Sequence, residues 1–149
     1  MAGKFILGLE TDQDRLNEID VLSRVSEKYK RISYEQTPKF TRYDANLYVD
    51  DNLYAIVEIK CRKEITHDRF NSVILRTDKW KACQRIAKEK NVKFLVFFRY
   101  LDGIFFLDET NTKINEGGRS VGSFKPKNNP YGESEEVIFF PLNLLKKLV

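Results

Sequence analysis

The chain has 149 residues, of which 42% are hydrophobic and 32% are charged, and its formal net charge is +4. This composition is typical of a soluble globular protein, and the length suits a single domain over residues 1–149 with a hydrophobic core. No apolar run approaches the ~20 residues of a membrane helix and the start lacks a signal-peptide pattern, so we expect a cytoplasmic protein that does not bind membranes.

The first expected element is a helix that begins at Thr11 or Asp12 and ends near Lys30. Acidic residues at its start and basic residues at its end favour this assignment, because they complement the helix dipole. Glu18 lies at the border of the apolar stripe. The residues expected to form this buried stripe are Leu16, Ile19, Leu22, Val25 and Tyr29.

Residues 43–60 are typical of a β-hairpin whose second strand ends in Glu58, Ile59 and Lys60. Side chains on a strand alternate between its two faces, so Glu58 and Lys60 point the same way and Ile59 points the other way. Residues 53–57 are apolar on both faces, as in a central strand. A carboxylate and an ammonium group at the end of such a strand indicate a site; the alternative is a solvent-exposed polar pair.

The turn of this hairpin decides which residue lies opposite Glu58. A three-residue loop at residues 50–52 places Asp44 opposite Glu58, whereas a two-residue loop at residues 51–52 places Asp44 opposite Ile59. Directly opposed carboxylates, with Cβ atoms about 4.5–5.5 Å apart, repel each other. A divalent cation between them would remove this repulsion, so the first register predicts a metal site and the second excludes it.

The remaining pattern predicts a mixed α/β arrangement. A second helix from Asp78 to about Lys90 has an apolar face that includes Trp80 and a basic outer face that is expected to be solvated. The other expected elements are strands at 30–34, 71–76, 92–100, 104–107 and 137–140, a hairpin turn at 102–103, a mobile basic loop at 117–132 and a short helix from residue 142.

The scarce reactive side chains exclude several kinds of site. His67 is the only histidine, which argues against a zinc cluster, a histidine-based nuclease and a Ser-His-Asp triad. Cys61 and Cys83 show no CxxC spacing, so we expect both to be reduced. The modest basic excess is compatible with a polyanionic partner but does not identify one.

Asp44 followed by Glu58-Ile59-Lys60 resembles the signature of the PD-(D/E)XK nucleases, although Tyr43 stands where that family often has proline. The family places a glutamate-bearing helix before the hairpin and a helix and a strand after it, and both are expected here, over most of residues 10–108. The resemblance implies an α/β fold in which helices flank a central mixed β-sheet, a restriction-endonuclease-like core.

The resemblance also implies DNA cleavage that depends on Mg²⁺ or Mn²⁺. Asp44, Glu58 and the main-chain carbonyl of Ile59 would bind the ion. Lys60 would orient or help deprotonate the attacking water, and Glu18 would extend the metal shell. The alternatives are that Asp44 is an ordinary strand-edge residue and that Glu18 lies on the helix surface; Glu10 and Glu27 compete with Glu18 for its role.

Four further residues are candidate nucleic-acid contacts: Lys81, Gln84, Lys125 and Lys127. The small size suits a structure-specific endonuclease such as a Holliday-junction resolvase, which implies a homodimer acting on branched DNA in a phage or microbial setting. The alternatives are a restriction-type endonuclease, an exonuclease or repair nickase of the same fold, and a nucleic-acid-binding module without activity. Cleavage products would separate the enzymes, and the complete Asp-Glu-Lys set argues against the inactive module.

Overall fold

The computed structural model describes residues 12–110, 120–124 and 135–149. The two α-helices are α1 (Asp12–Lys28) and α2 (Thr77–Lys90), and a 3₁₀ turn, η2, covers Leu142–Leu144. The strands are β1 (Ile32–Gln36), β2 (Ala45–Val49), β3 (Asn52–Arg62), β4 (Ser72–Arg76), β5 (Lys93–Tyr100), β6 (Gly103–Asp108), β7 (Ser120–Phe124), β8 (Glu135–Pro141) and β9 (Lys146–Lys147).

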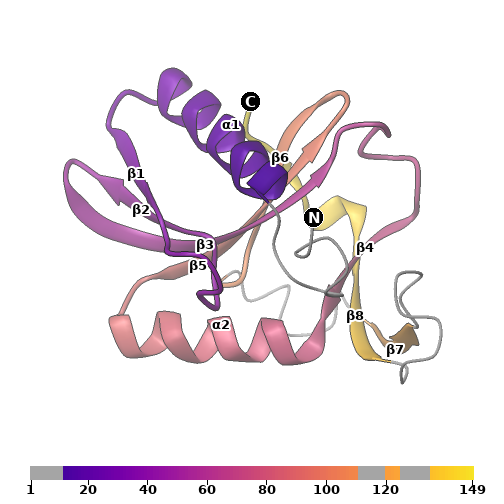
Figure 1. The fold of residues 1–149 in the computed structure, drawn as a ribbon. Coiled ribbons are helices and arrows are strands. Elements are labelled where there is room, and N and C mark those ends of the chain that lie inside the picture. The colour runs from indigo at the N-terminus through magenta and orange to yellow at the C-terminus, as the bar shows by residue number, and fades with distance from the viewer. Residues whose placement is uncertain (1–11, 111–119, 125–134) are drawn as a thin grey trace.

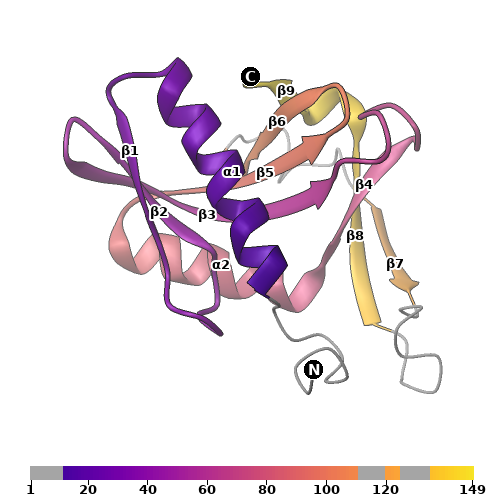
Figure 2. The ribbon, with the colours of Figure 1, turned by 45° about the horizontal axis from the view of Figure 1, so that its top comes forward.

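A six-stranded sheet in the order β1-β2-β3-β5-β6-β9 forms the centre of the fold. Its strands pair antiparallel except β3 and β5, which are parallel, so the sheet is mixed. The two helices lie on opposite faces of this sheet, and β4, β8 and β7 form a second, three-stranded sheet beside it (Figures 1 and 2). The predicted α/β fold with a central mixed sheet is confirmed. No helix within the described ranges is long and apolar enough to cross a membrane.

Each face of the central sheet has its own hydrophobic cluster. On the α2 face, Trp80 is fully buried and its ring lies 5.2 Å from that of Phe94 and 4.8 Å from that of Phe140. On the α1 face, Leu22 and Val25 pack among buried residues of β2, β3 and β5. Both faces of the sheet are therefore packed, and β3 lies between the two helices.

The predicted buried stripe of α1 is partly wrong. Leu16 and Ile19 are 59% and 38% exposed, and Tyr29 lies beyond the end of the helix at Lys28. The face that meets the sheet instead carries Glu18, whose carboxylate accepts a hydrogen bond of 3.1 Å from the amide of Gln36. This bond compensates in part for burial of the charge. The buried residues of α1 are Glu18, Val21, Leu22 and Val25.

The predicted three-residue loop of the hairpin is also wrong. Val49 pairs with Asn52, so the loop consists of Asp50 and Asp51 alone. Both loop residues have positive φ angles, 49° and 66°, as a type I′ turn requires, and aspartate tolerates this conformation better than most residues.

A β-bulge follows the turn and changes the register. The pairing shifts by one residue between Leu47 and Tyr48, which leaves Tyr54 as an extra residue in β3. Beyond the bulge, Ala45 pairs with Val57. The two-residue turn and the one-residue bulge together give the register that a three-residue loop would give on its own.

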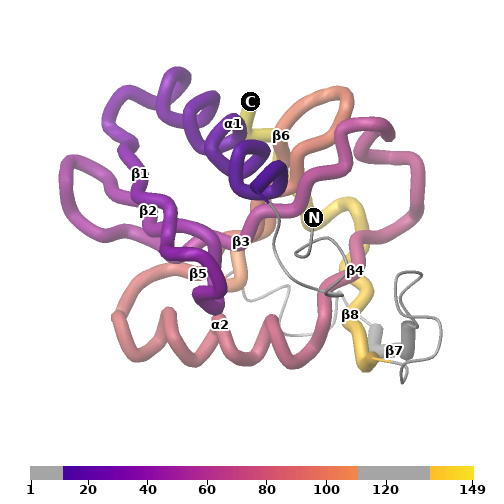
Figure 3. Tube along the Cα trace, viewed as in Figure 1, coloured from indigo at the N-terminus to yellow at the C-terminus, as the bar shows by residue number. Residues whose placement is uncertain are grey.

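The connection from β3 to α2 brings the start of α2 back to the sheet. Figure 3 shows the chain leaving β3, passing through a loop and β4, and then entering α2. The loop is fixed to the β5–β6 hairpin, because Leu101 N–H donates to the Ile65 carbonyl at 2.8 Å and His67 N–H donates to the Asp102 carboxylate at 2.9 Å. The His67 ring also stacks on Phe105, with centroids 4.4 Å apart. These contacts set where α2 begins.

Smaller expectations differ at element ends. Asp78 does not cap α2: the N-cap position is Arg76, and Asp78 instead accepts a hydrogen bond from the Lys79 N–H at 2.7 Å. The expected hairpin turn at 102–103 lies one residue earlier, because Gly103 already pairs with Tyr100.

Two expectations near the carboxyl end are also corrected. The loop expected at 117–132 contains strand β7, which pairs with β8. The helix expected from Leu142 is a single 3₁₀ turn followed by β9. Lys125 and Lys127, the candidate DNA contacts of that loop, lie outside the described residues.

Candidate active site

Asp44 and Glu58 form an opposed pair where β2 begins. Asp44 directly precedes Ala45, whose partner is Val57, so the next pair along the ladder is Asp44 and Glu58. The Asp44 N–H donates to the Val57 carbonyl at 2.9 Å. The Asp44 carboxylate accepts a hydrogen bond of 2.7 Å from the Ile59 N–H. One side-chain oxygen of Asp44 is thus fixed to the backbone of the strand that carries Glu58.

The pKa of Asp44 reflects the crowding of carboxylates at this position. Burial, the charge of Glu58, a hydrogen bond with Glu58 and the more distant charge of Glu18 together raise the pKa of Asp44 to about 9. The hydrogen bond from Ile59 N–H acts in the opposite direction. Two carboxyl groups at such close range favour a shared proton or a bound cation, since two neighbouring negative charges in a buried site repel strongly.

Glu58 lies between two ammonium groups from different elements. Its side chain is 8% exposed; Oε2 is 3.4 Å from Nζ of Lys60 and Oε1 is 3.5 Å from Nζ of Lys79. Both distances exceed the usual range for a hydrogen bond, and Oε1 is buried without a hydrogen-bond partner. Each oxygen of the Glu58 carboxylate therefore faces an ammonium charge, and Oε1 makes no hydrogen bond.

Glu18 approaches the same region from α1. It is 7% exposed, and Gln36, which donates to its carboxylate, also donates to the Arg15 carbonyl at 3.0 Å. Its charge acts on Asp44. Of its two competitors, Glu27 is exposed near the other end of α1 and Glu10 lies outside the described residues.

The chemistry of these groups fits a hard divalent cation. Asp44 and Glu58 offer carboxylate oxygens, and the bonding capacity of the buried Oε1 of Glu58 is unused. Burial, followed by repulsion from Glu58, raises the pKa of Asp44, and a cation between the two carboxylates would oppose both effects. Within the described ranges, no three His, Cys, Asp or Glu side chains already form a metal-ligand cluster, so the acidic pair is the centre to which further ligands would be added.

Comparison with known proteins decides the family. A family model described as "Phage putative PDDEXK endonuclease" matches residues 7–148. The chain belongs to this family. A search of solved structures found a nuclease from a fusselovirus that is 16% identical, with a TM-score of 0.49 and a match over 94% of this chain and 89% of that chain. No curated protein sequence matches the chain.

As a member of the PD-(D/E)XK endonuclease family, the protein bears out the resemblance that Asp44, Glu58 and Lys60 carry. The structure brings these three residues together at the carboxyl half of β3, and it brings the charge of Glu18 within reach of Asp44. The roles of the individual side chains remain predictions.

Two other candidate residues lie away from the acidic pair of this family member. The Gln84 amide donates to the Glu109 carboxylate at 2.6 Å. Lys81 and Gln84 line a cavity of about 550 Å³, together with Arg85 and Lys88 of the same helix, and none of the acidic site residues lines it. The structure therefore does not bring Lys81 or Gln84 to the site.

Lys79 lies beside Glu58, although the sequence predicts a solvated basic face for α2. A topological signal was available. β3 and β5 are parallel neighbours joined through α2. The first turn of a crossover helix follows the carboxyl end of the strand before it, so a residue of that turn is a natural neighbour of Glu58 and Lys60.

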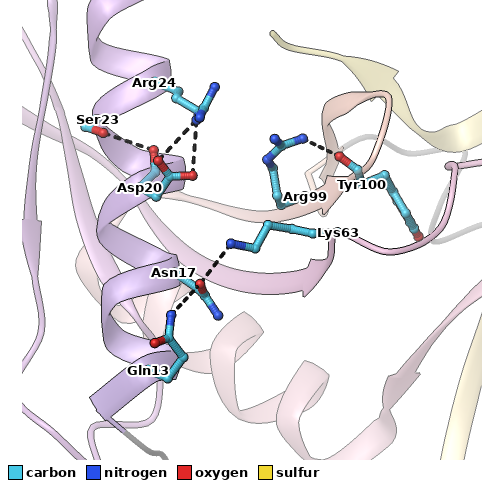
Figure 4. A network of polar contacts seen from close by, with 8 residues as sticks. All are labelled: Gln13, Asn17, Asp20, Ser23, Arg24, Lys63, Arg99 and Tyr100. Atoms are coloured by element: carbon cyan, nitrogen blue, oxygen red, sulfur yellow. Dashed lines mark hydrogen bonds and ion pairs between the residues drawn. The ribbon is translucent and has the colours of Figure 1, made fainter.

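Two cations, Lys63 and Arg99, lie near the carboxyl ends of β3 and β5. Figure 4 shows Lys63 reaching Asn17 of α1, whereas the Arg99 guanidinium turns to the Tyr100 carbonyl. Nζ of Lys63 donates to the Asn17 side chain at 3.1 Å, and Arg99 donates to the Tyr100 carbonyl while its Nε is buried without a partner. Neither cation has a carboxylate partner in the part of the chain that the structure describes. Such cations suit a polyanionic ligand.

Proposed function

We propose that this protein hydrolyses phosphodiester bonds of DNA with the help of Mg²⁺ or Mn²⁺. The observation that carries the proposal is the buried pair of opposed carboxylates, Asp44 and Glu58, with the Lys60 ammonium 3.4 Å from Glu58. Membership of an endonuclease family supports the reaction type.

Asp44 and Glu58 would hold the ion, together with the main-chain carbonyl of Ile59. When bound, the ion supplies Lewis-acid stabilisation of the phosphate and lowers the pKa of a coordinated water. The Ile59 N–H holds the Asp44 carboxylate against β3, which leaves its second oxygen to act as a ligand. Glu18, buried beside Gln36, would complete the shell through a water molecule or directly.

Lys60 would act on the nucleophile. It projects from the same face of β3 as Glu58, two residues further along the strand, and a third of its side chain is exposed. An ammonium group there orients the attacking water and stabilises the negative charge that develops on the phosphate oxygens. Its contact with Glu58 holds it in place before substrate binds.

The DNA backbone would run along the cations beside the site. Lys63 and Arg99 would contact phosphates near the carboxyl ends of β3 and β5, because neither has a carboxylate partner among the described residues. The exposed Lys81 remains a proposed contact, as do Lys125 and Lys127. Gln84 is a weaker candidate, since Glu109 already occupies its amide.

The proposed substrate is branched DNA, cut by a homodimer in the manner of a Holliday-junction resolvase inside the host cell. The support is the family description, which names a phage endonuclease. Two sites related by a twofold axis would address two strands of a junction at once.

The test is incubation with a four-way junction, linear duplex and single-stranded DNA, each with and without Mg²⁺. We expect cleavage of the junction that requires Mg²⁺, is lost in Glu58→Gln and Lys60→Ala, and persists in Lys90→Ala, a change of an exposed lysine at the far end of α2. No cleavage of any substrate, or full activity of Glu58→Gln, would overturn the proposed function. Cleavage of linear duplex alone, at a sequence or from an end, would overturn the junction substrate.

A further inference from the structure

Lys79 forms an ion pair with one oxygen of Glu58. Its Nζ lies 3.5 Å from Oε1, and this oxygen is buried without a hydrogen bond. The side chain of Lys79 is 32% exposed, while that of Glu58 is 8% exposed. The contact thus joins a buried carboxylate oxygen to the ammonium group of a side chain that is one-third exposed.

The position of Lys79 in α2 does not explain its orientation. The first turn of a helix is the positive end of its dipole, where a lysine is unfavourable unless a nearby carboxylate compensates. The adjacent carboxylate, Asp78, pairs with Arg76 at 2.7 Å. The attraction that holds Lys79 is therefore its contact with Glu58.

Lys60 and Lys79 contact Glu58 from different elements: Lys60 lies on the same strand as Glu58, and Lys79 lies on α2. Lys60 belongs to the same strand as Glu58 and keeps its place on the same face whenever β3 is formed. Lys79 comes from another element and turns away by rotating its own side chain, without any movement of β3 or α2. The ion pair is long and makes no hydrogen bond at Oε1, so a cation that replaces the ammonium group there would restore the charge compensation that Glu58 loses.

We propose that Lys79 is an exchangeable counterion: it neutralises Glu58 in the metal-free protein, leaves Oε1 when a divalent cation binds there, and then contacts a phosphate of the DNA. The inference rests on the proposed function. A cation bound at Oε1 of Glu58 would create an excess of positive charge beside Lys60 and Lys79, and we expect Lys79 to leave because it is the ammonium group that faces this oxygen. The incoming phosphate is the group that removes this excess.

The test compares Lys79→Met with wild type and with Lys90→Met as the matched helix control. Mn²⁺ binding is measured by calorimetry without DNA, and thermal unfolding is measured in EDTA. We expect Lys79→Met to bind Mn²⁺ about fivefold more tightly, because the competing ammonium group is gone, and to unfold at a lower temperature in EDTA. In cleavage assays the same variant should show a higher KM for DNA, with kcat much less affected.

The sign of the change in Mn²⁺ affinity decides the inference. Weaker or unchanged Mn²⁺ binding by Lys79→Met, with normal binding by wild type, would overturn the inference and leave the proposed function intact. Absence of Mn²⁺ binding by wild type would overturn the proposed function and this inference together. Lys79→Arg, which keeps the charge, should return the Mn²⁺ affinity towards that of wild type; if Lys79→Met does not fold, Lys79→Gln replaces it.

Discussion

Asp44 and Glu58 lie opposite each other on neighbouring strands, although the turn between these strands has two residues. A regular ladder from that turn would place Asp44 opposite Val57 instead. The extra residue in β3, Tyr54, moves the pairing by one position and so brings the two carboxylates together. The acidic pair therefore depends on the bulge as much as on the turn.

Shortening β3 within the bulge tests this relationship. Deleting Tyr54, which is 41% exposed, removes the extra residue and leaves Asp44 opposite Glu58, so we expect folding and cleavage close to wild type. Deleting Ala55 shortens the strand equally but moves the tyrosine into a fully buried position next to Leu47. We expect overpacking that costs about 1–3 kcal/mol or more in chemical denaturation. Equal loss of stability in both deletions would contradict the assigned bulge.

Asp44→Asn should make the protein more stable and inactive. The pKa of Asp44 is about 9 in the folded protein and 3.8 for the ordinary group, so the folded state holds an extra proton between these values. The free energy of unfolding of wild type therefore falls as pH rises through this window. Asparagine removes this dependence and keeps an acceptor for the Ile59 N–H.

Urea unfolding in EDTA from pH 5 to pH 8 measures this effect. We expect the free energy of unfolding of Asp44→Asn to exceed that of wild type by an amount that grows as pH rises. The difference should reach on the order of a few kcal/mol at pH 8. Asp20→Asn, on the exposed face of α1, is the control and should show no such trend. If Asp44→Asn is less stable than wild type at pH 8, the raised pKa of Asp44 is ruled out.

Lys60→Met should slow cleavage with little effect on DNA binding. The methionine keeps the length of the stem and removes the ammonium group that we place next to the attacking water. Loss of one such group typically lowers kcat by about 10²–10³. Single-turnover cleavage and fluorescence anisotropy measure the two steps, with Lys146→Met on the short β9 strand as control. A KM increase with unchanged kcat would assign Lys60 to binding.

Lys63 and Arg99 should contribute to binding through phosphate contacts. In Lys63→Ala, the logarithm of the DNA-binding constant should depend less steeply on the logarithm of the salt concentration, with a slope smaller by about 1. The affinity should fall by the same factor for all DNA sequences. Lys63 makes one hydrogen bond to a neutral amide, so its removal should cost little stability. An unchanged salt slope in Lys63→Ala would remove this residue from the proposed DNA path.

Much of the fold follows from local patterns in the sequence. The hairpin strand that ends in Glu58 and Lys60, the α2 helix and the apolar strand β5 are long or strongly patterned, and each forms where expected. Sequence alone did not resolve the turn at residues 50–52, because its three polar residues suit either loop length. The bulge at Tyr54 has no local sequence signal, since it depends on pairing with β2.

The remaining differences come from long-range contacts. Glu18 is buried because α1 rotates its 18–25 face onto the sheet, where Gln36 is available to bond with it. Lys79 is next to Glu58 because β3 and β5 pair in parallel, a feature of topology that helix periodicity does not contain. The second sheet joins β4 to β8, segments far apart in the chain.

Direct measurement of Mn²⁺ binding tests the central claim most closely, because it needs no knowledge of the preferred DNA. Free Mn²⁺ is followed by electron paramagnetic resonance in wild type, Asp44→Asn and Glu58→Gln between pH 6 and pH 9. We predict that wild type binds Mn²⁺, that affinity rises with pH as Asp44 loses its proton, and that both variants lose most of the binding. Wild-type affinity in Glu58→Gln, or no binding by wild type at any pH, would contradict the assignment of Asp44 and Glu58 as the metal site.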